Sequence, residues 1–137
     1  MSEQSLVVFS EDPPITIGRI RAASVLDAIN VNNFGSDLAN YVEKHPGLYL
    51  LLDFEDVDYL SSAVLTELLR INKMITESGG LFRLCALNPD IRKVFEITNL
   101  DKLFVIYESL DDGVRKFKRS LDIEAQQSAW DEMNKKL

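Results

Sequence analysis

The stretch that decides the fold is residues 48–65, which read LYLLLDFEDVDYLSSAVL. Its first part, Leu48–Phe54, is almost continuously apolar, as is typical of a strand that is buried on both faces of a sheet. The next part, Glu55–Leu60, carries three acids and is expected to be a loop. A serine pair, Ser61 and Ser62, then leads into a second apolar pattern.

That second pattern predicts a long amphipathic helix from Ala63. Its apolar residues recur at helical spacing, with two more leucines widening the stripe: Val64, Leu65, Leu68, Leu69, Ile71 and Ile75. Gly79-Gly80 is expected to end the helix. A strand, an acidic loop and a helix therefore follow one another directly.

The rest of the chain alternates between strand and helix patterns. Strands are expected over residues 6–9, 15–20, 81–87 and 103–107, and helices over 34–45, 89–99 and from 110 onward, with residues 21–31 left undecided. Asn88-Pro89-Asp90 is the clearest helix start, because it combines a cap, a proline and an acid in the first turn. The alternation predicts an α/β fold with a mostly parallel central sheet of about five strands and about four helices.

Composition narrows the class of protein. The chain has 137 residues, 46% of them hydrophobic, and a formal net charge of −7. The negative net charge disfavours binding to nucleic acid or to anionic membranes, and it is compatible with a basic protein partner. No apolar run is long enough to span a bilayer, and the first residues do not resemble a signal peptide. We therefore expect a cytoplasmic protein that does not insert into membranes.

Cofactor and metal motifs are absent from the sequence. It holds one cysteine, Cys85, and one histidine, His45, which cannot build a typical zinc site. It lacks both the G-x-G-x-x-G pattern and a Walker lysine. The acids around the central strand end, Asp53, Glu55, Asp56 and Asp58, are expected to be solvated loop residues. We predict no cofactor and no bound metal.

The serine pair has two plausible roles. A serine is a preferred N-cap, and we expect Ser62 to cap the helix while Ser61 points outward. A phosphorylated serine at a helix N-terminus would meet free N–H groups and the positive end of the helix dipole. A partner that had closed over Ser61 would instead meet a buried dianion, at a cost of several kcal/mol. The pair therefore suggests a switch.

Two segments resemble the STAS domain, namely residues 50–65 and 79–104. Together they resemble the bacterial anti-sigma factor antagonists over roughly residues 5–118. The resemblance implies a STAS-like fold. It also implies that Ser61 is phosphorylated by an anti-sigma factor that is a serine kinase. The unphosphorylated antagonist would bind that anti-sigma factor and free the sigma factor, and a serine phosphatase would reset the switch.

Two positions depart from the motif of that family, Asp-Ser-Ser/Thr-Gly. Leu60 stands where the family commonly has Asp, and Ala63 stands where it commonly has Gly. We expect the partner-binding surface to comprise Asp58, Tyr59, Leu60, Ser61, Ser62, Val64 and, from the loop before the first helix, Asp27. The protein is expected to bind partners and not to be an enzyme.

Two other functions stay open from the sequence. One is a STAS scaffold that is not phosphorylated, within a stressosome-like or lipid-transport complex, which Leu60 favours. The other is a small α/β enzyme that uses the acids after the central strand.

The C-terminal residues form a separate pattern. We assign residues 1–120 to the domain and 121–137 to a helical extension. Ile123, Trp130 and Leu137 repeat every seven residues, with Met133 beside them. We expect this helix to pack back on its own domain, and the alternative is a homodimer or partner contact through it.

Overall fold

Five strands form the central sheet in the computed structural model, which describes residues 6–21, 25–26 and 31–135. In sheet order they are β1 (Val7–Asp12), β2 (Ile15–Ile20), β4 (Tyr49–Asp53), β6 (Leu81–Cys85) and β7 (Ile106–Tyr107). The β1–β2 pair is antiparallel, and every other pair in this sheet is parallel. The predicted α/β fold with a mostly parallel sheet is confirmed.

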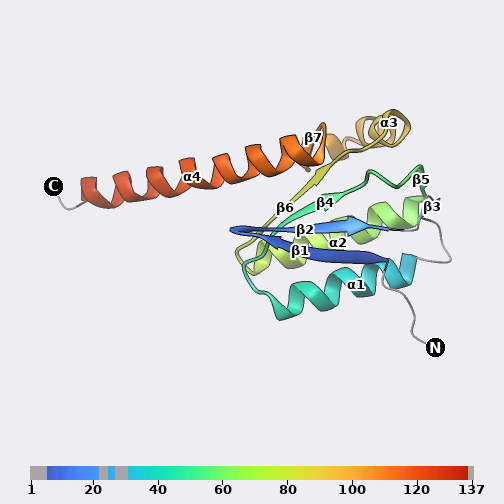
Figure 1. The fold of residues 1–137 in the computed structure, drawn as a ribbon, viewed down its shortest axis with the longest axis horizontal. Coiled ribbons are helices and arrows are strands. Elements are labelled where there is room, and N and C mark those ends of the chain that lie inside the picture. The colour runs from blue at the N-terminus through green and yellow to red at the C-terminus, as the bar shows by residue number, and fades with distance from the viewer. Residues whose placement is uncertain (1–5, 22–24, 27–30, 136–137) are drawn as a thin grey trace.

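Helices cover both faces of this sheet (Figure 1). One face is covered by α1 (Val31–Lys44), α2 (Ser62–Glu77) and α3 (Pro89–Ile97), and the other by the first half of α4 (Leu110–Lys135). A short 3-10 helix, Leu100–Lys102, follows α3. The N–H groups of Leu103 and Phe104 both donate to the Leu100 carbonyl oxygen, so the turn continues past the 3-10 helix, and the last strand is shorter than the predicted 103–107.

The core lies on both sides of the central strand β4. Leu50 and Leu52 belong to the large cluster beneath α1, α2 and α3, whereas Leu51 belongs to a smaller cluster with Cys85 and Phe117 of α4. All three leucines are fully buried. The prediction of a strand buried on both faces is confirmed. Cys85 is a buried free thiol.

A second, two-stranded sheet lies beside the start of α2. It pairs β3 (Val25–Leu26) with β5 (Tyr59–Leu60) in parallel, with Val25 opposite Tyr59. The sequence left residues 21–31 undecided and predicted a loop through residue 60. The end of that loop is instead a strand that leads directly into Ser61.

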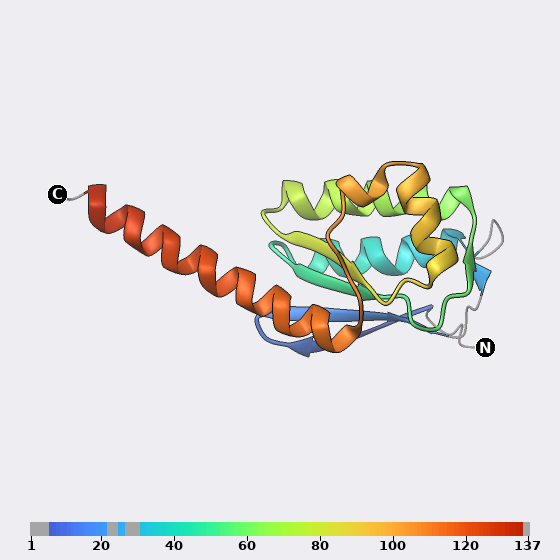
Figure 2. The same ribbon diagram turned by 90° about the horizontal axis from the view of Figure 1, so that it is seen from above.

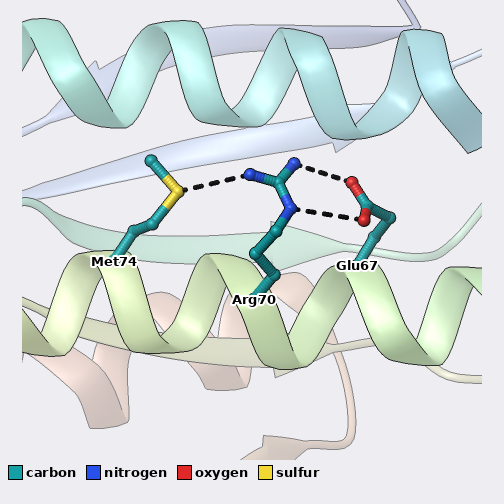
Figure 3. A network of polar contacts seen from close by, with 3 residues as sticks. All are labelled: Glu67, Arg70 and Met74. Atoms are coloured by element: carbon teal, nitrogen blue, oxygen red, sulfur yellow. Dashed lines mark hydrogen bonds and ion pairs between the residues drawn. The ribbon is translucent and has the colours of Figure 1, made fainter.

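Helices α1 and α2 lie side by side, with polar side chains between them (Figure 3). Arg70 of α2 donates to Glu67, with a distance of 2.7 Å from Nη2 to Oε1, and also contacts the sulfur of Met74. Gly35 of α1 faces this pair, and a Cβ atom there would overlap the Glu67 carboxylate. The small residue thus lets the two helices approach closely enough to form one layer.

Helix α4 leaves the domain after Leu121. Its first half buries Phe117 against the sheet, whereas every residue from Asp122 to Lys135 is exposed. Figure 2 shows this second half projecting away from all other elements. The expectation that the extension packs back on its own domain is therefore wrong.

Candidate functional site

The two serines at the N-terminus of α2 each lie in a position other than the expected one. The helix begins at Ser62, one residue earlier than predicted, so Ser61 takes the N-cap position, with extended backbone angles of φ −89° and ψ 166°. Ser62 is the exposed first residue of the helix. The expectation that Ser62 caps and Ser61 points outward is wrong, because the extended conformation needed at a cap falls on Ser61.

The Ser61 hydroxyl is buried and unpaired. Its Oγ makes no cap hydrogen bond and has no hydrogen-bond partner in the described part of the chain. The residue as a whole is half-buried. Because no hydrogen bond holds the hydroxyl in place, rotation about the Cα–Cβ bond would break none. A change of rotamer that exposed the hydroxyl would therefore cost no hydrogen bond.

Two predicted surface residues lie in the core. The side chain of Val64 is fully buried and that of Leu60 is 6% exposed, and both contact the large hydrophobic cluster. Val64 belongs to the apolar stripe of α2, and Leu60 points inward from β5. A partner would have to open the core to touch the side chain of Val64, so its expected place in the contact surface is wrong. Leu60 also lines the groove beside Tyr59, so its partner-binding role stays a prediction.

Three of the remaining predicted surface residues are accessible to a partner. Asp58 and Ser62 are exposed, and Tyr59 is 59% exposed. Their partner-binding role stays a prediction. Asp27 lies outside the described residues.

A small groove lies next to Tyr59. It has a volume of about 160 Å³ and is formed by β5 and the start of α3: Asp58, Tyr59, Leu60, Asp90, Ile91 and Val94. Val94 of α3 is 37% exposed and lines this groove. Two exposed acids thus flank an apolar surface.

The side chain of Asn88 forms hydrogen bonds to both segments that border this groove. Its side-chain oxygen caps α3 by accepting from the Ile91 backbone N–H at 2.8 Å, which confirms the predicted cap. Its side-chain nitrogen donates to the carbonyl oxygens of Val57 at 3.3 Å and Asp58 at 3.0 Å. The sequence identified the cap but gave no signal for the second contact, which spans about thirty residues of chain.

The family model for the STAS domain matches residues 9–113. The chain belongs to the STAS domain family. The match covers the central sheet, the serine pair and the start of α4.

Relatives of this STAS domain are described as anti-sigma factor antagonists. BtrV of Bordetella bronchiseptica is 32% identical over 97 residues, which are 71% of this chain and 83% of BtrV. An anti-sigma factor antagonist (STAS) domain protein from Planctomyces limnophilus has a similar fold, with a TM-score of 0.76 at 21% identity over 82% of this chain and 97% of that one. SpoIIAA of Bacillus in its phosphorylated form gives a TM-score of 0.62 at 14% identity over 80% of this chain and 97% of SpoIIAA.

Asp53 is the buried acid of this STAS domain. It is 1% exposed, its Oδ1 accepts from the Glu55 backbone N–H at 3.0 Å, and its Oδ2 has no partner among the described residues. Burial raises the pKa of this carboxyl. The expectation of solvated loop acids is thus wrong for Asp53 but holds for Glu55, Asp56 and Asp58, which are exposed.

The acids do not form a metal site in the described part of the chain, where no group of three or more His, Cys, Asp or Glu side chains could hold an ion. Asp56 instead pairs with Arg19 at 3.2 Å. Among the described residues, no helix is both long enough and apolar enough to cross a membrane.

Proposed function

We propose that this STAS domain is an anti-sigma factor antagonist that acts by partner switching. In its unphosphorylated form it binds an anti-sigma factor of the serine-kinase type, and phosphorylation of Ser61 releases that partner. A serine phosphatase restores the binding form. The protein works in the cytoplasm. It catalyses no reaction itself, and ATP is bound by the kinase. The observation that carries the proposal is Ser61 at the N-terminus of α2, beside an exposed surface, in a chain related to such antagonists.

The proposed contact surface comprises the exposed residues around the serines and the groove beside them. Tyr59 offers a large ring to a partner, and exposed aromatic residues are frequent binding anchors. Asp58 and Asp90 place two carboxylates at the groove. A partner segment with an apolar side chain flanked by Lys or Arg fits this combination.

Phosphorylation of Ser61 is compatible with the fold. The Val64 N–H of the first turn of α2 donates to the Ser61 carbonyl oxygen at 3.1 Å, whereas the N–H groups of Ser62 and Ala63 come too early in the helix to have partners within it. The helix dipole also favours negative charge at this end. A phosphate on Ser61 would therefore be stabilised by the domain that carries it. That the phosphorylated SpoIIAA shares this fold supports the same conclusion. The free domain tolerates the phosphate, whereas a closely packed partner does not.

The direct test is to map the phosphorylation site. The full chain is incubated with ATP, Mg²⁺ and a serine-kinase anti-sigma factor from the same genome, and phosphopeptides are identified by mass spectrometry. We expect phosphate on Ser61, retained in Ser62→Ala and lost in Ser61→Ala. Phosphate on the more exposed Ser62 would contradict the choice of acceptor, and phosphate on neither would contradict the switch.

A second candidate function is a scaffold whose binding is not controlled by phosphate. The buried Ser61 hydroxyl and the buried, apolar Leu60 in place of the family's usual acid favour it. Such a protein would remain unmodified in the kinase assay and yet co-purify with a stable multiprotein complex. Recovery of a stressosome-like or lipid-transport assembly would support this alternative over the switch.

A further inference from the structure

A second groove lies where the projecting half of α4 leaves the domain. It has a volume of about 490 Å³. Its apolar lining comes from Tyr49 and Leu81, which begin β4 and β6, and from Leu121 and Ala125 of α4. The groove therefore lies at the end of the sheet where the parallel strands begin, and it is separate from the groove beside Tyr59.

Carboxylates line the same groove and continue beyond it. Asp122 and Glu124 of α4 are part of its lining. With about 100° of rotation per residue, Asp131 lies roughly 20° around the helix from Glu124, and Glu132 lies roughly 40° around it from Ser128, which also lines the groove. The groove thus opens onto an acidic side of α4.

This acidic side is not neutralised within the described part of the chain. Residues 120–134 contain no Lys or Arg, and the four acids make no ion pair with any described residue. Lys118 comes just before the groove, but its ammonium group pairs with Asp12. The next basic residue of α4, Lys135, lies about 10 Å beyond Ser128 along the helix. Uncompensated negative charge therefore borders an apolar surface.

We propose that this groove binds a basic amphipathic segment of a protein partner. Apolar side chains of the segment pack on Tyr49, Leu81 and Leu121, and its Lys or Arg side chains face the acids. Complementary charge attracts such a segment and excludes an acidic one. The acids from Asp122 to Glu132 extend over about 15 Å of helix, which matches about three turns of a partner helix laid along the groove.

The groove and Ser61 lie at opposite ends of the domain. Helix α2 begins at Ser62 and ends at Glu77, and Gly79, two residues later, lines the groove. The 16 residues of α2 span about 24 Å, whereas charges in salt solution are screened within about 8–10 Å. Figure 1 shows α4 projecting beyond one end of the sheet and β5 at the other. Both surfaces can thus be occupied at once, and the inference does not depend on the proposed switch.

The test uses a defined probe, a synthetic peptide of about four helical turns made of lysine and of leucine at helical spacing. It is titrated into the isotope-labelled full chain and followed by NMR. We expect the backbone amide signals of Tyr49, Gly79, Leu81 and Ala125 to shift. A second peptide with alanine at each leucine position keeps the charge and the helix propensity. We expect it to bind at least ~10-fold more weakly, because it buries less apolar surface.

Charge reversal tests whether the acids of the groove make the contact. Asp122→Lys with Glu124→Lys is expected to raise the dissociation constant of the leucine peptide at least ~10-fold, because like charges then face each other. The matched control, Glu96→Lys with Asp101→Lys, changes the net charge equally at exposed acids that do not line the groove. We expect it to change the dissociation constant by no more than about twofold, because salt screens exposed charges. Circular dichroism checks that each variant is folded.

Four results would overturn the proposal. Equal weakening by the two pairs of substitutions would show that the peptide responds only to net charge. Shifts confined to the signals around Tyr59 and Asp90 would place the peptide in the other groove. Equal affinity of the alanine peptide would remove the apolar contact, and the absence of binding would remove the site.

Discussion

The side-chain amide of Asn88 donates a hydrogen bond of 3.0 Å to the carbonyl oxygen of Asp58. The same side chain caps α3 through Ile91. One residue thus fixes the start of α3 and holds the segment that leads into β5 and Ser61. The groove beside Tyr59 depends on both contacts, because its two sides come from these two elements.

Replacement of Asn88 separates the two roles. Asn88→Ala removes the cap, worth about 1 kcal/mol, and leaves two carbonyl oxygens without their donor, so we expect a loss of about 2–3 kcal/mol of unfolding free energy. Asn88→Asp keeps an acceptor that caps well but cannot donate from an ionised carboxylate. We expect it to cost about 1 kcal/mol less than the alanine variant in urea denaturation. Equal losses would show that the Asp58 and Val57 contacts, and not the cap, dominate.

Neighbouring residues of β5 are predicted to have opposite phenotypes. Leu60→Ala removes a buried side chain and should lower the unfolding free energy by about 2–5 kcal/mol. Tyr59→Ala changes an exposed side chain and should alter stability by no more than about 0.5 kcal/mol. It should nevertheless weaken binding to the anti-sigma factor at least about tenfold, measured by calorimetry. Unchanged affinity would remove Tyr59 from the proposed contact surface.

The buried carboxyl of Asp53 makes stability depend on pH. Its folded-state pKa is raised by burial, so on raising the pH the unfolded chain releases this proton before the folded chain does. Between the two pKa values the unfolded state binds fewer protons, and the unfolding free energy falls as the pH rises. The contribution is complete below the unfolded-state pKa and is lost as the pH passes through the raised value.

Asp53→Asn isolates this effect, because an amide oxygen can still accept from the Glu55 N–H and the side chain no longer titrates. We expect the unfolding free energy of the variant minus that of the unaltered protein to increase from about pH 4 to about pH 7. Urea denaturation at several pH values across that range measures this difference in unfolding free energy. The contributions of the other titrating groups cancel in it. A difference that is constant with pH would contradict the raised pKa.

The sheet and its helices could be predicted because the sequence patterns that indicate them extend over many residues. The apolar run of β4, the helical spacing from Val64 to Ile75 and the cap at Asn88 each extend over several residues or combine several cues. Strands β3 and β5 have two residues each, too few for any periodicity, and their pairing joins distant segments. They could not be predicted from local patterns.

The site could be predicted only in part, because local sequence patterns do not fix its details. The serine pair marks the helix start, but the backbone at that start decides which serine takes the N-cap position. A one-residue shift places Ser61 there, without a cap hydrogen bond, and leaves Ser62 exposed. The heptad spacing after Leu121 indicates an apolar face on α4. It does not say whether that face meets its own domain, and the direction in which the helix leaves the sheet decides this.

The central claim is that phosphate on Ser61 releases the partner. The most direct measurement is the calorimetric dissociation constant for the anti-sigma factor of two preparations of the full chain, one unmodified and one phosphorylated only at Ser61. Ser62→Glu is the control for added charge at the neighbouring position. We predict that phosphate on Ser61 weakens binding on the order of 10²-fold or more, because a dianion is buried without a partner. Equal dissociation constants for the two preparations would contradict the switch.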